Sequence, residues 1–153
     1  HNHGAWELVD GHMEVMSLGH AEAMTGPYFA RDMKVSGTVT PLSGESHLMS
    51  VRVQGAQRGV YGGLGVADGV RSLVMGKTVH GRWQLLTSRP FDWQEDHEYA
   101  LTLAAEGQTF TLTMDGGEPL SVRDDTACAY GMVGYAQYAM GRTAFGNLTL
   151  EER

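Results

Sequence analysis

Hydrophobic and polar residues alternate with a period of two along most of this chain, which predicts β-strands with one buried face. The clearest case lies at 99–114. Apolar residues occupy every second position of 99–103 and of 110–114, and the turn Glu106-Gly107 separates the two segments. Alternating segments on both sides of a glycine-containing turn are typical of a β-hairpin. We therefore predict a hairpin whose one face is buried and whose other face meets water.

The same alternation, interrupted by turn residues, recurs over the whole chain and indicates about a dozen strands. They are expected at 6–9, 12–17, 22–26, 33–40, 47–54, 60–66, 70–78, 82–88, 99–106, 108–114, 120–123, 132–138 and 143–150. No segment has helical periodicity over three turns. We predict an all-β protein, a two-sheet antiparallel β-sandwich. Its expected core contains Val51, Val53, Leu101, Leu103, Phe110, Leu112, Val133 and Phe145.

The length of 153 residues fits one domain, which we place at 4–152, with 1–3 as a tag remnant or the end of a linker. A net charge of −7 with only two lysines argues against nucleic acid as a partner. No apolar run is long enough to span a bilayer, and no signal peptide opens the chain. The single cysteine, Cys128, excludes an internal disulfide and a cysteine-based metal cluster. We expect a reducing compartment, that is, a cytoplasm.

The order of several motifs resembles the concanavalin-A-like jelly roll. The motifs are Val51-Arg52-Val53-Gln54, Val60-Tyr61-Gly62-Gly63, Arg82-Trp83-Gln84-Leu85-Leu86, Tyr99-Ala100-Leu101-Thr102-Leu103, and the closing pair Met132-Val133-Gly134 and Phe145-Gly146-Asn147. Levan-binding carbohydrate-binding modules are similar in strand order and in the closing motif. The resemblance covers nearly the whole chain and implies a jelly-roll accessory module.

A closer resemblance is to the C-terminal β-sandwich of bacterial ADP-ribosylglycohydrolase-family proteins. It rests on the segments 21–26 (Ala-Glu-Ala-Met-Thr-Gly), 32–47 and 51–58 (Val-Arg-Val-Gln-Gly-Ala-Gln-Arg). The resemblance implies a module excised from a larger bacterial hydrolase, with the catalytic domain of the same parent chain as a partner. It implies no activity for this chain, since fold does not carry function with it. The expected ligand is a carbohydrate or an ADP-ribose-like molecule.

The strand at 47–54 carries the first candidate binding residues. Met49, Val51 and Val53 share one face, so Arg52 and Gln54 are expected on the other, about 6–7 Å apart. That spacing suits two polar groups that grip one sugar ring. The alternative is that a cross-strand carboxylate holds Arg52 on an ordinary solvated face.

Further candidates surround this strand. Glu45 and Arg58 are expected at the rim, and Tyr61, Trp83 and Tyr138 as an aromatic platform on neighbouring strands. Large aromatic residues in a sandwich are more often part of the core, and that alternative stays open. Glycines at 62, 63 and 65 predict either a shallow depression for a ligand or a bend in the strand.

Metal and catalytic chemistry have weaker signals. Glu22, Asp32 and Asn147 are the candidates for a structural calcium, which prefers oxygen ligands, although they are also ordinary turn residues. The carboxylate pairs Glu95-Asp96 and Asp124-Asp125 fall in connections, and no catalytic motif is present. We therefore expect no enzyme activity and no cofactor other than calcium. A docking or dimerisation domain is the second hypothesis, and a glycoside hydrolase the third.

Overall fold

The structure of the protein is a computed structural model that describes residues 5–9 and 12–152, with side chains from residue 12 onward. Within these ranges the chain forms thirteen strands and no helix. The prediction of an all-β antiparallel sandwich is thereby confirmed. Over the same residues, no helix is long and apolar enough to cross a membrane.

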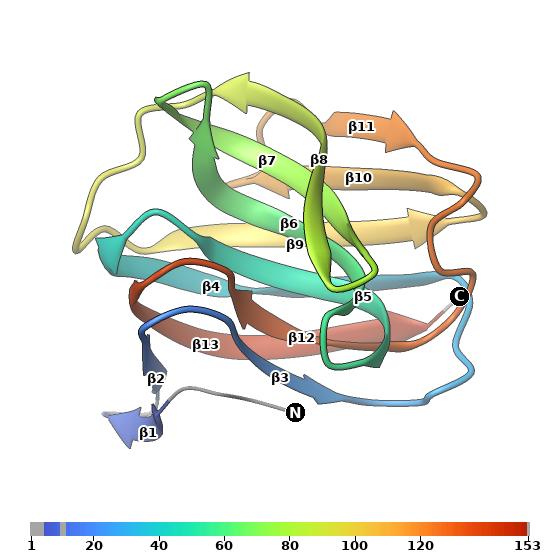
Figure 1. The fold of residues 1–153 in the computed structure, drawn as a ribbon, viewed down its shortest axis with the longest axis horizontal. Coiled ribbons are helices and arrows are strands. Elements are labelled where there is room, and N and C mark those ends of the chain that lie inside the picture. Colours follow the sequence, from blue (N-terminus) through green and yellow to red (C-terminus); the bar gives the residue numbers. More distant parts are fainter. Residues whose placement is uncertain (1–4, 10–11, 153) are drawn as a thin grey trace.

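The strands form two antiparallel sheets that pack face to face (Figure 1). The seven-stranded sheet has the order β1 (Ala5–Val9), β2 (His12–Ser17), β13 (Gly141–Glu152), β4 (Met33–Gly44), β9 (Tyr99–Glu106), β10 (Thr109–Met114) and β11 (Leu120–Arg123). The six-stranded sheet has the order β3 (Ala21–Thr25), β12 (Met132–Gln137), β5 (His47–Gly55), β6 (Arg58–Ala67), β7 (Val70–Val79) and β8 (Arg82–Pro90). The six-stranded sheet faces the viewer in Figure 1.

The core lies between the two sheets, as the alternation predicts. On β9 and β10 the apolar residues that recur every second position point inward, whereas their threonine and alanine neighbours are partly or fully exposed. All eight residues expected in the core are at most 1% exposed. They include Phe110 and Leu112 from the hairpin and Val51 from the facing sheet, which join one hydrophobic cluster. The buried face of the hairpin was therefore predicted correctly.

Strand β4 continues past Pro41, where the sequence predicts its end. Pro41 is paired with Thr143 of β13 next to a shift in register between Arg142 and Thr143. Proline has no N–H to donate, so it is tolerated where the ladder is already irregular. The carbonyl of Pro41 accepts a hydrogen bond from the Asp96 N–H at 2.8 Å. Pro41 predicted the end of the strand, but the pairing with β13 extends β4 beyond it.

The outer face of the six-stranded sheet carries a second apolar cluster. Its buried members are Leu48, Tyr61, Ala67, Val74 and Ala136, and Trp83 and Tyr138 pack against it from above. Gly76 allows the Trp83 ring to lie across β7, because a Cβ at position 76 would be 2.5 Å from Trp83 Cη2. A sheet face that points away from the main core is usually polar. This one is apolar and only partly covered.

Candidate functional site

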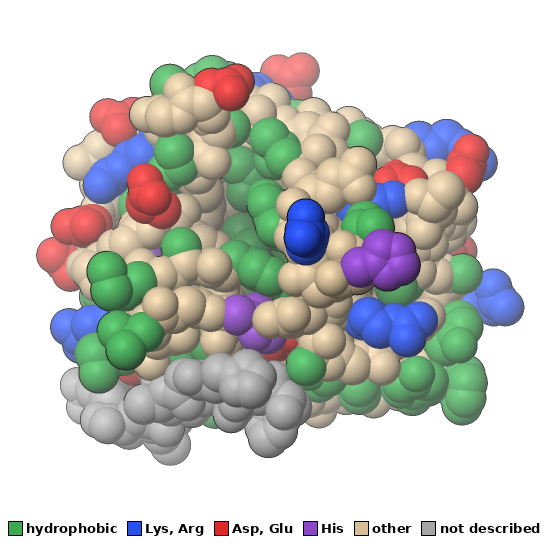
Figure 2. Space-filling model, in the orientation of Figure 1, with side chains coloured by type: hydrophobic (Ala, Val, Ile, Leu, Met, Phe, Trp, Pro, Cys, Tyr) green, Lys and Arg blue, Asp and Glu red, His purple; other side chains and the backbone are tan. Residues whose placement is uncertain are grey.

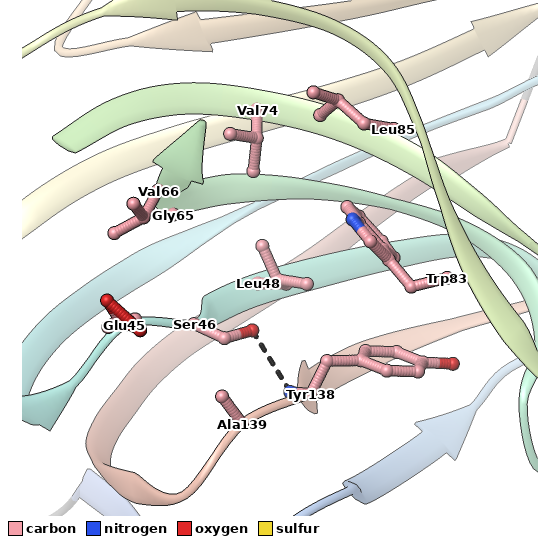
Figure 3. Close-up of a pocket in the computed structure, with 10 residues that line it drawn as sticks. All are labelled: Glu45, Ser46, Leu48, Gly65, Val66, Val74, Trp83, Leu85, Tyr138 and Ala139. Atoms are coloured by element: carbon pink, nitrogen blue, oxygen red, sulfur yellow. Dashed lines mark hydrogen bonds between the residues drawn. The ribbon is translucent and has the colours of Figure 1, made fainter. Parts of the chain in front are cut away.

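A groove of about 290 Å³ opens on the outer face of the six-stranded sheet (Figure 3). Strands β5, β6, β7 and β8 and the segment after β12 line it, through Glu45, Ser46, Leu48, Gly65, Val66, Val74, Trp83, Leu85, Tyr138 and Ala139. Leu48 and Val74 form the floor, and Trp83 and Leu85 rise on one side (Figure 3). Figure 2 shows the same region as a hollow with hydrophobic side chains at its bottom. The groove combines an apolar base with a polar end at Glu45.

Three aromatic rings form one cluster at the groove. The ring centroids of Trp83 and Tyr138 are 5.4 Å apart, and the Tyr61 ring lies 5.1 Å from Tyr138 and 6.2 Å from Trp83. The structure thus brings together the three aromatic residues singled out from the sequence. Tyr61 is fully buried, so it supports the other two rings from below, while Trp83 and Tyr138 are half-buried and line the groove.

A buried carboxylate fixes this aromatic cluster. Glu22 is 0% exposed, and its Oε1 accepts a hydrogen bond of 2.6 Å from the Tyr61 hydroxyl. Its Oε2 accepts the Gln57 N–H at 2.8 Å and lies 3.0 Å from His20 Nε2. Burial and the neighbouring Glu22 raise the pKa of Tyr61 far above its usual range, so this hydroxyl keeps its proton and donates. Glu22 therefore links β3 to the floor of the groove.

Arg52 does not lie on the front of the sheet, and this prediction was wrong. It is 1% exposed and has a φ of 53° within an irregular part of β5, where the pairing with both β12 and β6 shifts. The extra residue breaks the alternation that placed Arg52 opposite Val51. Gly131 packs against this bulge so closely that a Cβ there would be 2.3 Å from the Arg52 carbonyl carbon.

The buried guanidinium of Arg52 ties several loops together. Its Nε donates to the Arg31 carbonyl at 2.8 Å, and its Nη1 donates to Gln108 Oε1 at 2.7 Å and to the Cys128 carbonyl at 3.2 Å. Its Nη2 reaches Asp32 Oδ1 at 3.3 Å. Burial lowers the pKa of Arg52, while the Asp32 carboxylate opposes that shift. The role of Arg52 is therefore structural. The alternative prediction, an arginine held by a carboxylate, was correct about the Asp32 contact but wrong about the solvated surroundings.

Gln54 and Arg58 contact each other away from the groove. Arg58 Nη2 donates to Gln54 Oε1 at 3.4 Å, and Gln54 Nε2 donates to the Tyr130 carbonyl at 3.0 Å. Arg58 lines a different cavity, next to the turn between β5 and β6. The predicted single site is thus divided: Glu45, with two of the three aromatic residues, lines the groove, and Gln54 and Arg58 lie elsewhere.

The three calcium candidates do not share a site. Glu22 is held by the Tyr61 hydroxyl, Asp32 Oδ1 accepts from Arg52 and from the Gly107 N–H, and Asn147 lines another pocket. Across the part of the chain that the structure describes, no three His, Cys, Asp or Glu residues are grouped so as to hold a metal ion. The donor set of a calcium site is therefore not assembled from these residues.

His47, the first residue of β5, lies in the interior of the sandwich. Its Nε2 is 3.0 Å from the Gly44 carbonyl oxygen, and its Nδ1 contacts the Thr143 hydroxyl. Burial lowers the pKa of His47 to about 4, against the opposing effect of the Gly44 carbonyl, so the ring is neutral at pH 7.

Sequence reasoning missed Leu85 and Ser46 as groove residues. Leu85 lies two residues after Trp83 on β8 and so shares its face, a period-two relation that could have indicated Leu85 once Trp83 was a candidate. Ser46 lies in the turn before β5, and its Oγ accepts the Tyr138 N–H at 3.0 Å. That contact joins residues 92 positions apart, and no local pattern reveals it.

No family model matches the sequence, and no curated protein matches it. Solved structures do share its fold. The carbohydrate-binding module CBM66 from Bacillus subtilis superposes with a TM-score of 0.85 at 17% identity, over 98% of this chain and 92% of that one. A Bacillus subtilis protein of unknown function with a galectin-like fold gives 0.69 at 13% identity, over 99% and 88%. A toad ovary galectin in complex with thio-digalactose gives 0.61 at 12% identity, over 88% and 100%. These comparisons show that the chain has the β-sandwich fold that these galectin-like proteins and CBM66 share.

Proposed function

We propose that this chain is a non-catalytic carbohydrate-binding module and that its ligand occupies the groove on the outer face of the six-stranded sheet. The observation that carries the proposal is the groove itself, which has the half-buried Trp83 and Tyr138 rings toward one end and the exposed carboxylate of Glu45 at the other (Figure 3). Among proteins with this fold, one is a carbohydrate-binding module and another is a galectin bound to thio-digalactose. These two proteins support a saccharide as the ligand class.

The chemistry of the groove suits a neutral sugar ring. The C–H bonds of a sugar pack favourably on aromatic and aliphatic surfaces, which Trp83, Leu85 and the Leu48 floor provide. Glu45 is exposed at the polar end, so its carboxylate can accept hydrogen bonds from two adjacent hydroxyl groups. Such open sites with few polar contacts bind in the micromolar to millimolar range.

Binding rather than hydrolysis is supported by the acidic groups at this surface. Glycoside hydrolysis by the usual mechanism needs two carboxyl groups about 5–10 Å apart across the bond to be cleaved. Among the described residues that line the groove, Glu45 is the one with a carboxylate. Glu22 lies below the aromatic cluster with its oxygens already engaged by the Tyr61 hydroxyl and the Gln57 N–H.

The resemblance of the sequence to known accessory modules supports a more specific proposal about the parent protein and the ligand. We propose an accessory module of a bacterial ADP-ribosylglycohydrolase-like or glycoside-processing protein, with levan-type fructans and ADP-ribose as the first ligands to test. Docking onto a catalytic domain of the same parent chain, or dimerisation without a small ligand, is the competing function.

The test is a glycan array that includes fructans and ADP-ribose, with and without calcium, followed by titration of the best ligand into variants. We expect Trp83→Ala to reduce affinity at least about tenfold, equivalent to about 1.4 kcal/mol, and Glu45→Gln to reduce it less. Arg142→Ala is the control, because Arg142 pairs with Glu14 on the other sheet. Wild-type affinity in both groove variants would place the ligand elsewhere, and an array without any binder would favour the docking function.

A further inference from the structure

A second group of aromatic residues lies at one end of the sandwich, outside the groove. The connection from β3 to β4 contributes Tyr28 and Phe29, and the connection from β11 to β12 contributes Tyr130. These connections run along the right-hand edge of Figure 1. The ring centroids of Tyr28 and Phe29 are 5.0 Å apart, and the Tyr130 ring lies 5.8 Å from Tyr28 and 5.6 Å from Phe29. The three rings therefore form one cluster.

This cluster is exposed, yet it is held in place. Phe29 is 76% exposed and Tyr28 40%, so the rings contribute little to the core. The Tyr28 hydroxyl donates to the Gln54 carbonyl at 3.4 Å, and the Gln54 side chain donates to the Tyr130 carbonyl at 3.0 Å. Gln54 thus connects both loops to the end of β5. Exposed aromatic residues on anchored loops indicate a binding surface, because burial does not account for them.

A polar cavity of about 590 Å³ is linked to the aromatic cluster through Arg58 and Gln54. It lies between the β5–β6 turn, the β7–β8 turn and the loop before β12, and its lining includes Gln57, Arg58, Thr78, His80, Thr126 and Cys128. The two turns touch, since a Cβ on Gly81 would lie 3.1 Å from Gln57 Oε1. Arg58 connects the cavity to the rings through its 3.4 Å contact with Gln54. In Figure 2 basic and histidine side chains gather on the right of this face.

The charges at the cavity favour an anionic group. Lys77 lies behind the cavity, and its Nζ forms an ion pair of 2.7 Å with Asp124 Oδ2, which neutralises its charge. Burial raises the pKa of the Cys128 thiol, which keeps it uncharged near neutral pH. Of the lining residues that the structure describes, Arg58 is therefore the one with a permanent charge. Its planar guanidinium offers paired donors that match a carboxylate or a phosphate.

We propose that the aromatic cluster and this cavity form a second saccharide site, separate from the groove, for a sugar that carries an anionic group. The sugar ring stacks on Tyr28, Phe29 and Tyr130, and the anionic group faces Arg58. A saccharide is favoured over a protein partner because Arg58 links the rings to a recessed polar cavity, whereas a protein partner would favour a flat apolar surface. The site does not depend on the groove being occupied.

The test is to titrate the protein separately with glucuronate, glucose and acetate and to monitor each titration by two-dimensional ¹H–¹⁵N NMR. Glucuronate combines a ring and a carboxylate, while the other two probes present one of these features each. We expect glucuronate to shift the resonances of 28–29, 57–58, 78–81 and 128–130, with a dissociation constant in the millimolar range. Glucose and acetate should bind at least about fivefold more weakly, because each lacks one of the two interactions.

Variants locate the binding surface. Arg58→Ala should reduce the affinity for glucuronate about tenfold, to the affinity of the wild type for glucose. Phe29→Ala should reduce the affinity for both sugars. Both side chains are exposed, so the variants are expected to fold, and their spectra report whether they do. Trp83→Ala and Arg142→Ala should bind glucuronate as wild type does. The proposal would be overturned if W83A lost glucuronate binding, or if wild type bound acetate as tightly as glucuronate. It would also be overturned if glucuronate shifted only resonances of groove residues, or if the protein self-associated and bound no sugar.

Discussion

Among the residues whose side chains the structure describes, Arg52 and Glu22 are charged side chains with at most 1% exposure, and the extent of their hydrogen-bonded surroundings differs. Arg52 donates to loops from both sheets, through Arg31, Gln108 and Cys128. Glu22 accepts hydrogen bonds from the Tyr61 hydroxyl and the Gln57 N–H, which both belong to the six-stranded sheet and its turns. The arginine therefore holds the end of the sandwich together, whereas the glutamate organises the floor of one surface groove.

The comparison shows how position decides what a buried charge does. A buried ion whose partners belong to several separate segments contributes to global stability, because removing it leaves each partner without a donor. Glu22 has its partners beneath the aromatic cluster, and changes there are expected to act on the groove as well as on stability. Two measurements test this difference, and a third concerns a buried group that carries no charge at neutral pH.

The largest effect is expected for Arg52→Ala. The substitution leaves the Arg31 and Cys128 carbonyls and the Gln108 side chain without their donor, next to a cavity, and should lower the free energy of unfolding by about 3–5 kcal/mol. Urea denaturation measures it. Arg58→Ala is the matched control and should change stability by less than about 0.5 kcal/mol, as exposed positions usually do. An R52A variant as stable as wild type would contradict the structural role assigned to Arg52.

A smaller effect is expected for Tyr61→Phe. Loss of the hydroxyl removes a 2.6 Å hydrogen bond to a buried carboxylate, which should lower stability by about 1.5–3 kcal/mol. Because Tyr61 supports Tyr138 and Trp83, saccharide affinity in the groove should fall too, while binding at the aromatic loops should not. The comparison of Arg52 with Glu22 fails if this variant loses stability without any change in groove binding.

The smallest effect depends on pH and concerns His47, a buried group that is neutral. Its folded pKa of about 4 lies below the value of 6.5 for an unperturbed histidine, so the unfolded chain takes up the proton first. This contribution to stability is complete above about pH 6.5 and is lost as the pH falls toward 4. At pH 5 the loss relative to pH 8 should be about 2 kcal/mol.

The measurement is the stability difference between wild type and His47→Gln at both pH values, which cancels the titration of the other histidines. The gap should narrow by about 2 kcal/mol at pH 5, because glutamine does not titrate. A gap that stays constant between pH 8 and pH 5 would show that His47 titrates normally in the folded protein.

Much of the fold could be predicted from local pattern. Alternation over β9 and β10 located Phe110 and Leu112 in the core. The candidate site was predicted only in part. Tyr61, Trp83 and Tyr138 do meet, but parity along β5 failed at Arg52, because a bulge interrupts the alternation of the strand there.

The sequence by itself determined the strands, most of their buried faces and the absence of helical segments, because a period of two is a property of neighbouring residues. Only the tertiary structure decided where the bulge at Arg52 falls, since a bulge is defined by pairing with β12 and β6. It also decided that Ser46 meets Tyr138 and that Gln54 anchors Tyr28 and Tyr130. These contacts join residues far apart in the chain, and they exist only after the sheets have assembled.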